Sequence, residues 1–400
     1  MIFTTAFLHS DYLSNIAAIF GSQMILNYHS AHLIFFLLFT LTFVVQLFYY
    51  LYYYLAAALH QDTDFKGIKD PPVSVIICAR NEEENLKSFL TSVLEQDYPE
   101  YEVIVVNDCS EDDTYNILGE YLKKYSNLKV SNISKDPKFT HNKKFAQFIG
   151  IKAAKNEFLI FTDADCRPET NKWLHYMAAC FNDSIDFVLG YGGYFSKKGL
   201  LNKYIRYDSM VIAMQYFGMT IRRAPYMGVG RNLAYRRSMF FGKKGFGSHT
   251  HLASGDDDLF VNANSSGNNC AVEYRKESHT RSVPAKDIRS YFKQKKRHFS
   301  TSNHYKFKDK VMLIAEPLAR ILFYFSFVLL LLQLYLWPIV LTVFAARMIV
   351  RFSVLYLIQG KLNERGLLIY LPIFDILSPF INTLFYIGSL RQSTGKNRWK

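Results

Sequence analysis

Charged residues are absent from two long stretches of this sequence, and this absence restricts the possible folds more than any other feature. Residues 12–61 contain no Asp, Glu, Lys or Arg, and neither do residues 321–346. The apolar core of the first stretch, residues 33–59, is longer than the roughly 20 residues that cross a bilayer as a helix. A third apolar stretch, residues 367–390, contains one acid, Asp375. The sequence therefore predicts a membrane protein, which the 34 Phe and 28 Tyr also favour.

The same distribution divides the chain into four parts. The start of the chain lacks the basic residues of a signal peptide, so we expect the first apolar helix to be retained. The polar part between the first two apolar stretches is long enough for one domain with its own core. The expected parts are an N-terminal segment at 1–30, a transmembrane helix at 31–60, a polar domain at 61–316, and a membrane region with a basic tail at 317–400.

The C-terminal region allows two or three membrane segments. Trp337 and Pro338 indicate a hairpin between helices at 320–336 and 339–358, which places Arg347 and Arg351 deep in the second helix. Such arginines are costly unless they face protein or a polar cavity. The alternative is one span at 321–346, followed by an interfacial helix at 347–359. Pro379 interrupts the last apolar stretch, which is either a full span or a re-entrant segment.

Charge and cysteine usage limit the partners and the compartment. The net charge is +13, and many of the basic residues lie in 286–310, just before the second uncharged stretch. Positive charge in that place marks the cytoplasmic side of a membrane and favours anionic headgroups, so we expect no nucleic-acid partner. The five cysteines show no paired spacing and no metal-binding pattern, which fits a reducing compartment.

The first half of the polar domain alternates strand and helix patterns. Continuous apolar strands separated by helices of about 10 to 15 residues are typical of a parallel sheet with helices on both faces. The fold class is therefore α/β, with a doubly wound, mostly parallel sheet flanked by transmembrane helices at both ends. Beyond residue 190 the pattern changes to loops, glycines and basic clusters. The expected strands are 73–78, 103–106, 128–133, 158–161 and 186–190, and the expected helices are 81–94, 112–125 and 143–154.

Two carboxylates, Asp163 and Asp165, follow the expected strand at residues 158–161. Ligands of open parallel sheets bind at the carboxyl ends of the strands, so these acids are expected where a substrate lies. At this spacing both acids reach one divalent cation, and oxygen ligands favour Mg²⁺ or Mn²⁺. The alternative is an acidic turn without a ligand.

The ends of the first two strands carry a second group of polar residues. Ala79, Asn81 and Glu82 follow the first strand, and Asp108 follows the second. At the same sheet edge, an acid and a backbone turn can recognise a nucleotide base and ribose. Helix capping is the alternative role for each of them.

Three further groups of residues could take part in binding or catalysis. Lys144 at the start of a predicted helix suits a phosphate, or simply a solvated helix. Asp256 and Asp257, within the run SGDDDLF, suit a general base. Gln294 and Arg297 precede the membrane region, where they suit either a diphosphate clamp or juxtamembrane positive charge.

These segments resemble, in order and approximate spacing, the membrane-bound family-2 glycosyltransferases, a group related to polysaccharide synthases and ceramide glucosyltransferase-like enzymes. The resemblance covers residues 73–305 and implies a GT-A type fold. The segments that carry it are VSVIICARNEEENL, VVNDCSEDDT, NKKFAQFIGIKAA, FLIFTDADC, GVGRNLAYRRS, SGDDDLF and QKKRH.

The resemblance also implies roles for individual residues. Asp108 matches the acid that recognises the base of the donor, and Ala79, Asn81 and Glu82 match residues that line the same pocket. Asp163 and Asp165 match the DxD pair that holds the metal and the sugar nucleotide. Asp257 matches the general base, with Asp256 where the family usually has Glu, although a run of three acids leaves the register open by one residue. Gln294 and Arg297 match the QxxRW motif, in which His298 replaces the tryptophan.

The function implied is an inverting, metal-dependent glycosyltransferase that uses Mg²⁺ or Mn²⁺. It would move a sugar from a nucleotide sugar, expected to be UDP-linked, to a lipid or glycan acceptor at the membrane. The expected location is a bacterial inner membrane, with the catalytic domain in the cytoplasm. Two alternatives remain: a nucleotidyltransferase acting on a sugar phosphate, although its usual glycine-rich loop is missing, and a non-catalytic subunit of a membrane synthase.

Overall fold

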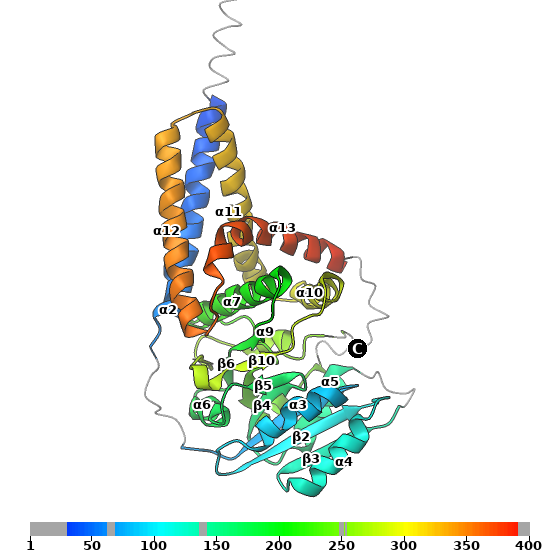
Figure 1. The fold of residues 1–400 in the computed structure, drawn as a ribbon. Helices are drawn as coiled ribbons and strands as arrows, with labels where there is room; N and C mark the ends of the chain where they lie inside the picture. Colours follow the sequence, from blue (N-terminus) through cyan, green and yellow to red (C-terminus); the bar gives the residue numbers. More distant parts are fainter. Residues whose placement is uncertain (1–29, 62–68, 136–141, 248–251, 253, 391–400) are drawn as a thin grey trace, which may run out of the picture. The chain divides into compact units, whose positions relative to one another are not determined.

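The computed structural model describes residues 30–61, 69–135, 142–247, 252 and 254–390, and Figure 1 shows its ribbon. The expected N-terminal segment before residue 30 and the basic tail after residue 390 lie outside the described residues. The chain forms two compact units. Among the described residues, one unit contains 30–48 and 315–351, and the other contains those between 49 and 314 and between 352 and 390.

The smaller unit consists of parts of three apolar helices, Ser30–Leu59, α11 (Phe307–Leu332) and α12 (Trp337–Lys361). Its core is aromatic, with Phe39 stacked on Phe323 at 4.7 Å between ring centroids. The chain turns between α11 and α12, as the hairpin alternative predicts, so a single helix does not continue through residue 346.

Both arginines of α12 have partners inside this unit. The guanidinium of Arg347 donates to Gln46 Oε1 at 2.8 Å and to the Tyr324 hydroxyl at 3.0 Å. Arg351 Nη1 lies 4.0 Å from Glu316 Oε1. Because a charge in an apolar helix is tolerated when it faces protein and a polar partner, these contacts explain how the sequence can place two arginines there.

Among the described residues, four helices are long and apolar enough to cross a membrane. They are Ser30–Leu59, Phe307–Leu332, Trp337–Lys361 and Leu368–Leu390.

The larger unit contains a seven-stranded sheet in the order β3-β2-β1-β4-β8-β6-β9. All neighbouring strands run parallel except at β8, which is antiparallel to both of its neighbours. A smaller sheet has the order β5-β10-β7. The strands are β1 Val73–Ala79, β2 Tyr101–Asp108, β3 Leu128–Ile133, β4 Phe158–Asp163, β5 Cys166–Pro168, β6 Phe187–Gly190, β7 Gly192–Tyr194, β8 Leu233–Arg236, β9 Cys270–Glu273 and β10 Thr280–Ser282.

Helices cover both faces of the large sheet. Val75 and Ile77 belong to a core shared with α3 (Glu83–Leu94), α4 (Thr114–Lys124) and α6 (Trp173–Ala179). Ile76 points to the other face and packs under α5 (Lys143–Ala153), where a Cβ on Gly150 would lie 2.7 Å from Ile76 Cγ2. The α/β fold with a mostly parallel sheet is therefore confirmed.

The region after residue 190 differs from the expectation of loops. It contains α7 (Leu200–Ile221), a 22-residue helix with most of its side chains buried. Because such a helix is surrounded by protein, it lacks the apolar stripe that identifies a helix in a sequence. A Cβ on Gly218 would lie 2.2 Å from the carbonyl oxygen of Tyr53, so only glycine allows α7 to approach the segment Tyr49–Tyr54 this closely.

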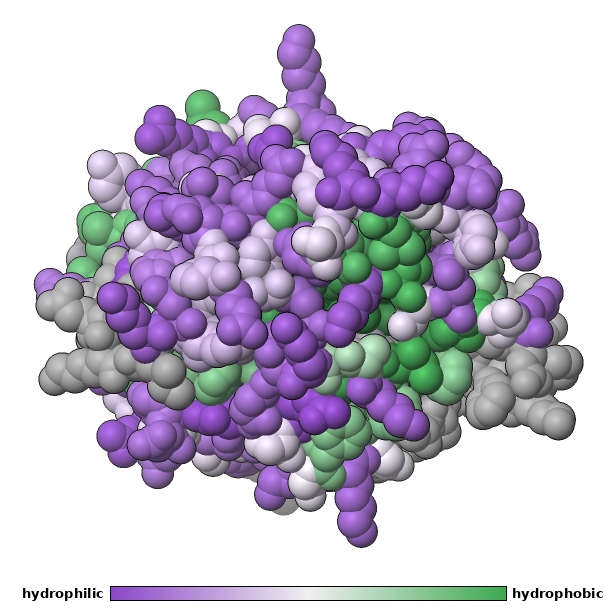
Figure 2. Space-filling model, turned by 90° about the horizontal axis from the view of Figure 1, so that it is seen from below, coloured by the Kyte–Doolittle hydropathy of each residue, from purple (hydrophilic) through white to green (hydrophobic). Residues whose placement is uncertain are grey.

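The larger unit also contains several other helices. They are α2 Leu55–Leu59, α8 Arg237–Gly242, α9 Asp258–Asn264, α10 Ile288–Ser302 and α13 Leu371–Leu390, with short 3-10 turns at Lys276–Ser278 and Leu368–Tyr370. The face seen from below, shown in Figure 2, is hydrophilic over most of its area and includes a smaller hydrophobic area. Such a surface is typical of a domain in contact with water.

Candidate active site

The ends of β1 and β2 meet at one edge of the sheet, where Ala79 lies opposite Asn107. Asn81 joins the two loops that follow, because its backbone N–H donates to Ser110 Oγ at 2.9 Å and its side-chain oxygen accepts from the backbone N–H of Glu111 at 2.8 Å. Its φ of 54° is a conformation that asparagine adopts more readily than most residues. The structure therefore brings the residues of the predicted base pocket together.

The two acids of this pocket are buried. The backbone N–H of Glu82 donates to Thr114 Oγ1 at 3.0 Å. The side chain of Asp108 is fully buried, and Arg80 Nη1 lies 3.8 Å from its Oδ2. Arg80, to which the sequence interpretation gave no role, thus provides positive charge beside the predicted base-recognising acid.

Lys143 lies at the centre of a second cluster of charges. Its Nζ is 2.7 Å from Asp163 Oδ1 and 3.2 Å from Asp256 Oδ2. It is the first residue of α5, whose start is fixed by the side chain of Asn142 accepting from the backbone N–H of Phe145 at 3.0 Å. One ammonium group thus joins the end of β4 to the acids before α9.

The neighbouring Lys144 has different surroundings. Its Nζ donates to the carbonyl oxygen of Leu252 at 3.1 Å, and burial lowers the pKa of this lysine to about 8. Of the two adjacent lysines, Lys143 is the one in contact with Asp163. A role for Lys144 in holding phosphate stays a prediction.

Asp163 and Asp165 differ in their ionisation. Burial opposes the charge of Asp163, but Lys143 outweighs it and holds the pKa of Asp163 below its ordinary value. Burial and the charge of Asp163 raise the pKa of Asp165 to about 6. Asp165 is positioned by Ser282, whose hydroxyl donates to its Oδ2 at 3.2 Å. The pair therefore combines a carboxylate that Lys143 holds ionised with one whose ionised form a bound cation would further favour.

The two carboxylates fit a hard divalent cation. Ligand atoms of Asp163, Asp165 and Cys166 all lie within 4.8 Å of one another. Burial raises the pKa of the Cys166 thiol, and a soft sulfur ligand suits a hard cation less well than carboxylate oxygens do. Carboxylate oxygens are ligands for Mg²⁺ or Mn²⁺, so Asp163 and Asp165 are the residues that would hold such an ion.

The three consecutive acids have three separate environments. Asp256 faces Lys143, as described above. Asp258 is buried and accepts hydrogen bonds from the hydroxyls of Thr301 and Tyr305. Asp257 is half-buried, and its two oxygens accept from the backbone N–H groups of Gly230 and Asp258, each at 2.7 Å.

Asp257 differs from its neighbours in a way that matters for proton transfer. Burial and the charges of Asp256 and Asp258 raise the pKa of Asp257 to about 7. A base with a pKa near the working pH is effective in general base catalysis. Gly230 keeps the space beside it open, since a Cβ there would lie 3.1 Å from Asp257 Oδ2 and 3.5 Å from Lys143 Nζ.

The candidate residues Gln294 and Arg297 lie on α10, which approaches Tyr194 of the small sheet. Gln294 Nε2 donates to the hydroxyl of Tyr194 at 3.3 Å, and the guanidinium of Arg231 lies 4.2 Å from the Tyr194 ring centroid. The positive charges of Arg231 and Arg297 also favour the ionised form of Asp163. His298, at the position of the expected tryptophan, is exposed.

Five residues of this region were not chosen as site residues from the sequence. Two of them could have been found from the sequence, because Gly230 and Arg231 both lie in GVGRN, which begins one of the segments that carry the family resemblance. Lys143 stands beside the lysine that was chosen, and the choice between them depends on the rotation of α5. The five residues are Arg80, Lys143, Tyr194, Gly230 and Arg231.

Comparison with known proteins identifies this arrangement. The family model described as Glycosyl transferase family 2 matches residues 74–241. Residues 74–241 of the chain therefore belong to glycosyltransferase family 2. The matched family 2 region contains the predicted base pocket and the DxD pair, whereas Asp256, Asp257, Gln294 and Arg297 lie beyond it.

Curated relatives of this family 2 chain match over short segments. Poly(ribitol-phosphate) beta-N-acetylglucosaminyltransferase TarS of Staphylococcus aureus is 39% identical over 97 residues, which is 23% of this chain and 16% of that protein. Glycosyltransferase AglE of Haloferax volcanii is 37% identical over 106 residues, which is 26% of this chain and 33% of that protein. The aligned segments thus span well under two thirds of these relatives.

A solved structure supports the GT-A fold. The mannosyltransferase PcManGT from Pyrobaculum calidifontis, in complex with GDP-Man and Mn²⁺, superimposes with a TM-score of 0.52 and 17% identity. The superposition covers 87% of this family 2 chain and 99% of that chain. At this level of identity the likeness establishes the fold alone.

Proposed function

We propose that this family 2 protein is an inverting glycosyltransferase, which moves a sugar from a nucleotide sugar to an acceptor at a membrane. The observation that carries the proposal is the arrangement around Lys143, whose ammonium lies 2.7 Å from Asp163 and 3.2 Å from Asp256. Lys143 thereby links one acid of the predicted donor-binding pair to Asp256, the residue before the candidate base, Asp257. A UDP-linked donor is the one we propose, with Mg²⁺ or Mn²⁺ as the cofactor.

The donor would lie along the carboxyl edge of the large sheet. Asp108, with Ala79, Asn81 and Glu82, would recognise the nucleoside, since these residues surround the two loops joined by Asn81. The diphosphate would reach Asp163 and Asp165. A divalent cation on these carboxylates would neutralise the negative charge that grows on the departing diphosphate.

Residues of the chain would carry out proton transfer and stabilise the leaving group. Asp257 would accept the proton of the acceptor hydroxyl while the acceptor oxygen bonds to the anomeric carbon of the donor. The bond between that carbon and the diphosphate oxygen breaks, the nucleoside diphosphate leaves with the electron pair, and the configuration at the carbon inverts. Arg297 and Arg231, whose charges already act on Asp163, would stabilise the leaving group.

Asp257 is favoured over its neighbours as the base for a geometric reason. Asp256 is held by Lys143, and Asp258 is buried under Thr301 and Tyr305. Asp257 alone of the three is half-buried, and its carboxylate lies against Gly230, which has no side chain. These contacts support Asp257 as the base among the three acids whose register the sequence left open.

The four long apolar helices support a membrane-associated enzyme with a lipid or glycan acceptor. A bacterial inner membrane, with the catalytic domain on the cytoplasmic side, is the location we propose. The basic residues of 286–310 favour that side.

One assay tests the proposal. The full chain, purified in detergent, is incubated with a panel of UDP- and GDP-sugars, Mn²⁺ or Mg²⁺, and lipid extract, and released nucleotide is identified. We expect a nucleoside diphosphate from at least one donor and loss of the signal with a chelator. Release of pyrophosphate from a nucleoside triphosphate would instead support a nucleotidyltransferase. No release from any donor would favour a non-catalytic subunit.

A further inference from the structure

The last apolar helix, α13, packs along the polar part of the larger unit. Near its start, Phe374 lies 5.2 Å from Tyr207 of α7, measured between ring centroids. Near its end, Phe385 lies 5.1 Å from Phe292 of α10, and the hydroxyl of Tyr386 donates to Asn303 Oδ1 at 3.0 Å. The helix therefore rests on the folded domain over most of its length.

The opposite side of α13 is exposed and apolar. Residues with large exposed side chains recur every three or four positions, which places them on one face of the helix. Asp375 and Ser378 lie on the buried side. An exposed apolar stripe of this length on a helix that also packs on protein is typical of contact with a membrane. The stripe consists of Ile373, Ile376, Leu377, Phe380, Leu384 and Ile387.

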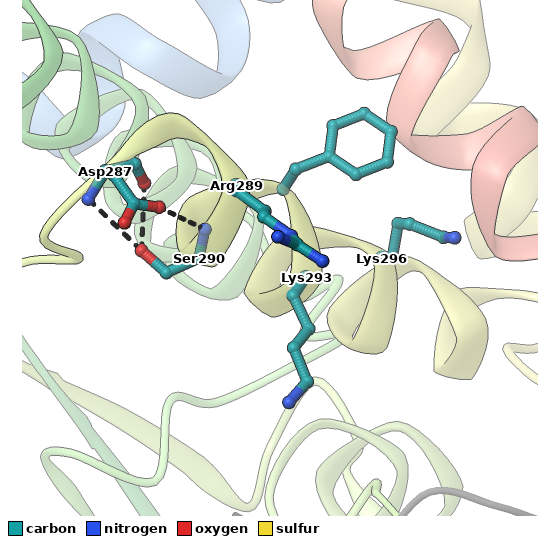
Figure 3. A pocket seen from close by; sticks show the side chains of 6 residues that line it. Asp287, Arg289, Ser290, Lys293 and Lys296 are labelled. Atoms are coloured by element: carbon teal, nitrogen blue, oxygen red, sulfur yellow. Dashed lines mark hydrogen bonds between the residues drawn. The ribbon is translucent and has the colours of Figure 1, made fainter.

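A basic cavity of about 440 Å³ lies beside this helix, on α10. Figure 3 shows Arg289, Lys293 and Lys296 around it, with Lys293 and Lys296 extending in different directions from the helix. Asp287 also lines the cavity, but its carboxylate accepts from the backbone N–H of Ser290 at 2.7 Å and caps the helix. Within the described part of the chain, no carboxylate forms an ion pair with these three cations.

The cavity and the apolar stripe belong to one surface. The carbon chain of Lys296 approaches α13, where a Cβ on Gly388 would lie 3.2 Å from Lys296 Cε. Its ammonium lies 5.6 Å from the ring centroid of Phe292, which itself packs on α13. Lysine thus covers apolar surface with its stem and keeps its charge at the edge, as side chains do at a membrane interface.

We propose that α10 and α13 form a docking surface for an anionic phospholipid bilayer. α13 lies in the plane of the interface with its apolar stripe among the acyl chains, and Arg289, Lys293 and Lys296 bind headgroup phosphates. Charge complementarity decides the occupant, because three cations beside an apolar helix match an acidic headgroup layer. If α13 crossed the bilayer, the lysines of the helix packed along it would enter the hydrocarbon, which is costly.

Lipid binding tests the basic half of the surface. Delipidated full-length protein in neutral detergent is titrated with phosphatidylglycerol or phosphatidylcholine, and bound lipid is counted by native mass spectrometry. We expect the variant R289Q/K293Q/K296Q to bind phosphatidylglycerol about 100-fold more weakly than the wild type. The control K87Q/K123Q/K124Q, which removes three exposed lysines of α3 and α4, should bind like the wild type. Equal affinity of all three proteins, or equal binding of the two lipids, overturns the proposal.

The depth of α13 tests the apolar half, and unlike the lipid titration it does not depend on charge. Phe380→Trp and Ile387→Trp are each reconstituted in vesicles that contain lipids brominated near the headgroup or near the chain end. We expect the added fluorescence of both variants to be quenched more by the shallow bromines. Stronger quenching of Phe380→Trp by the deep bromines shows that the helix crosses the bilayer, and excludes the proposed orientation. Neither experiment requires transferase activity. A failure of the proposed function can therefore be distinguished from a failure of the proposed membrane docking.

Discussion

Lys143 Nζ lies 2.7 Å from Asp163 Oδ1, at the end of the central strand β4. The same ammonium is 3.2 Å from Asp256 Oδ2, and only 21% of the lysine side chain is exposed. This lysine therefore compensates two acids from distant parts of the sequence. It also lies next to the carboxylate that is expected to bind a metal, so cation binding and the position of Lys143 are coupled.

Replacing Lys143 with methionine should destabilise the protein and increase its dependence on metal. Without the ammonium, Asp163 and Asp256 repel each other, and we expect a loss of about 2–3 kcal/mol in the free energy of unfolding. Mn²⁺ should then raise the melting temperature of the variant more than that of the wild type, because the ion replaces the lost positive charge. Thermal unfolding with and without Mn²⁺ measures both effects.

The exposed Lys152 on the same helix provides the matched control. Lys152→Met should melt within about 0.5 kcal/mol of the wild type, as exposed substitutions usually do. A Lys143→Met protein as stable as this control, with no added response to Mn²⁺, would show that the contact with Asp163 is unimportant.

Asp257→Asn should reduce turnover and leave donor binding nearly unchanged. A positioned general base contributes about 10²- to 10⁴-fold in rate, and asparagine keeps the size of the side chain while losing the basicity. Initial rates give the turnover, and titration with the donor gives the affinity. If turnover is unaffected, the assignment of the base to Asp257 is wrong.

Activity and stability should respond to pH in opposite directions through Asp257. Its pKa in the folded protein is raised to about 7, so turnover should rise with pH up to that value and then level off. An unfolded aspartate titrates near pH 4, so between about pH 4 and 7 the folded state holds a proton that the unfolded state has lost. The contribution of Asp257 to stability therefore falls as pH rises through this window.

Melting temperatures of the wild type and Asp257→Asn between pH 5 and 8 check this sign. The wild type should lose stability relative to the variant as the pH increases. A difference between the two proteins that stays constant with pH would contradict the raised pKa of Asp257.

Gly230→Ala should impair catalysis without unfolding the protein. The added methyl group would lie 3.1 Å from Asp257 Oδ2, tighter than ordinary contact, and would fill space that we assign to the acceptor hydroxyl. We expect turnover to fall by about tenfold or more, since small displacements of a catalytic group are costly. Gly119→Ala is the control, because no atom lies within 4 Å of its Cβ position and alanine is the better helix former. Full activity of Gly230→Ala would place the acceptor elsewhere.

Glu364→Gln should destabilise the larger unit. This fully buried carboxylate, in the loop after α12, accepts from Arg206 Nε at 2.7 Å, from Arg281 Nη1, and from the hydroxyl of Tyr191 at 2.9 Å. Removing one charge from a buried ionic cluster leaves its partners uncompensated, and costs about 3–5 kcal/mol. Thermal unfolding measures the loss, with the exposed Glu84→Gln as the control. An unchanged melting temperature would mean that the two arginines find other acceptors.

Several parts of the fold could be predicted because short-range patterns specify them. The third strand, Leu128–Ile133, has the predicted bounds. The first strand is one residue longer than predicted, because it also includes Ala79. Strands buried on both faces are continuous apolar runs, and the helices between them have polar first turns. The sheet edge that carries Asp108 and Asp163 follows directly, because parallel strands end at the same side.

The antiparallel strand β8 and the buried helix α7 could not be predicted in the same way. Neither has a local pattern that distinguishes it from loops, since β8 is short and α7 is surrounded by protein. The choice between Lys143 and Lys144 is similar, because adjacent residues on a helix differ by about 100° in direction and only the packing of α5 decides which one faces the acids.

The sequence by itself thus determined the long apolar helices, the α/β sheet and the chemical types of residues at its edge, because these depend on hydrophobicity, its periodicity and strand direction. The tertiary structure alone decided which of three adjacent acids is half-exposed beside Gly230 and which are occupied by Lys143 or by Thr301. It also decided that α13 packs along α10, since hydropathy measures how apolar a segment is and says nothing of the surface that it covers.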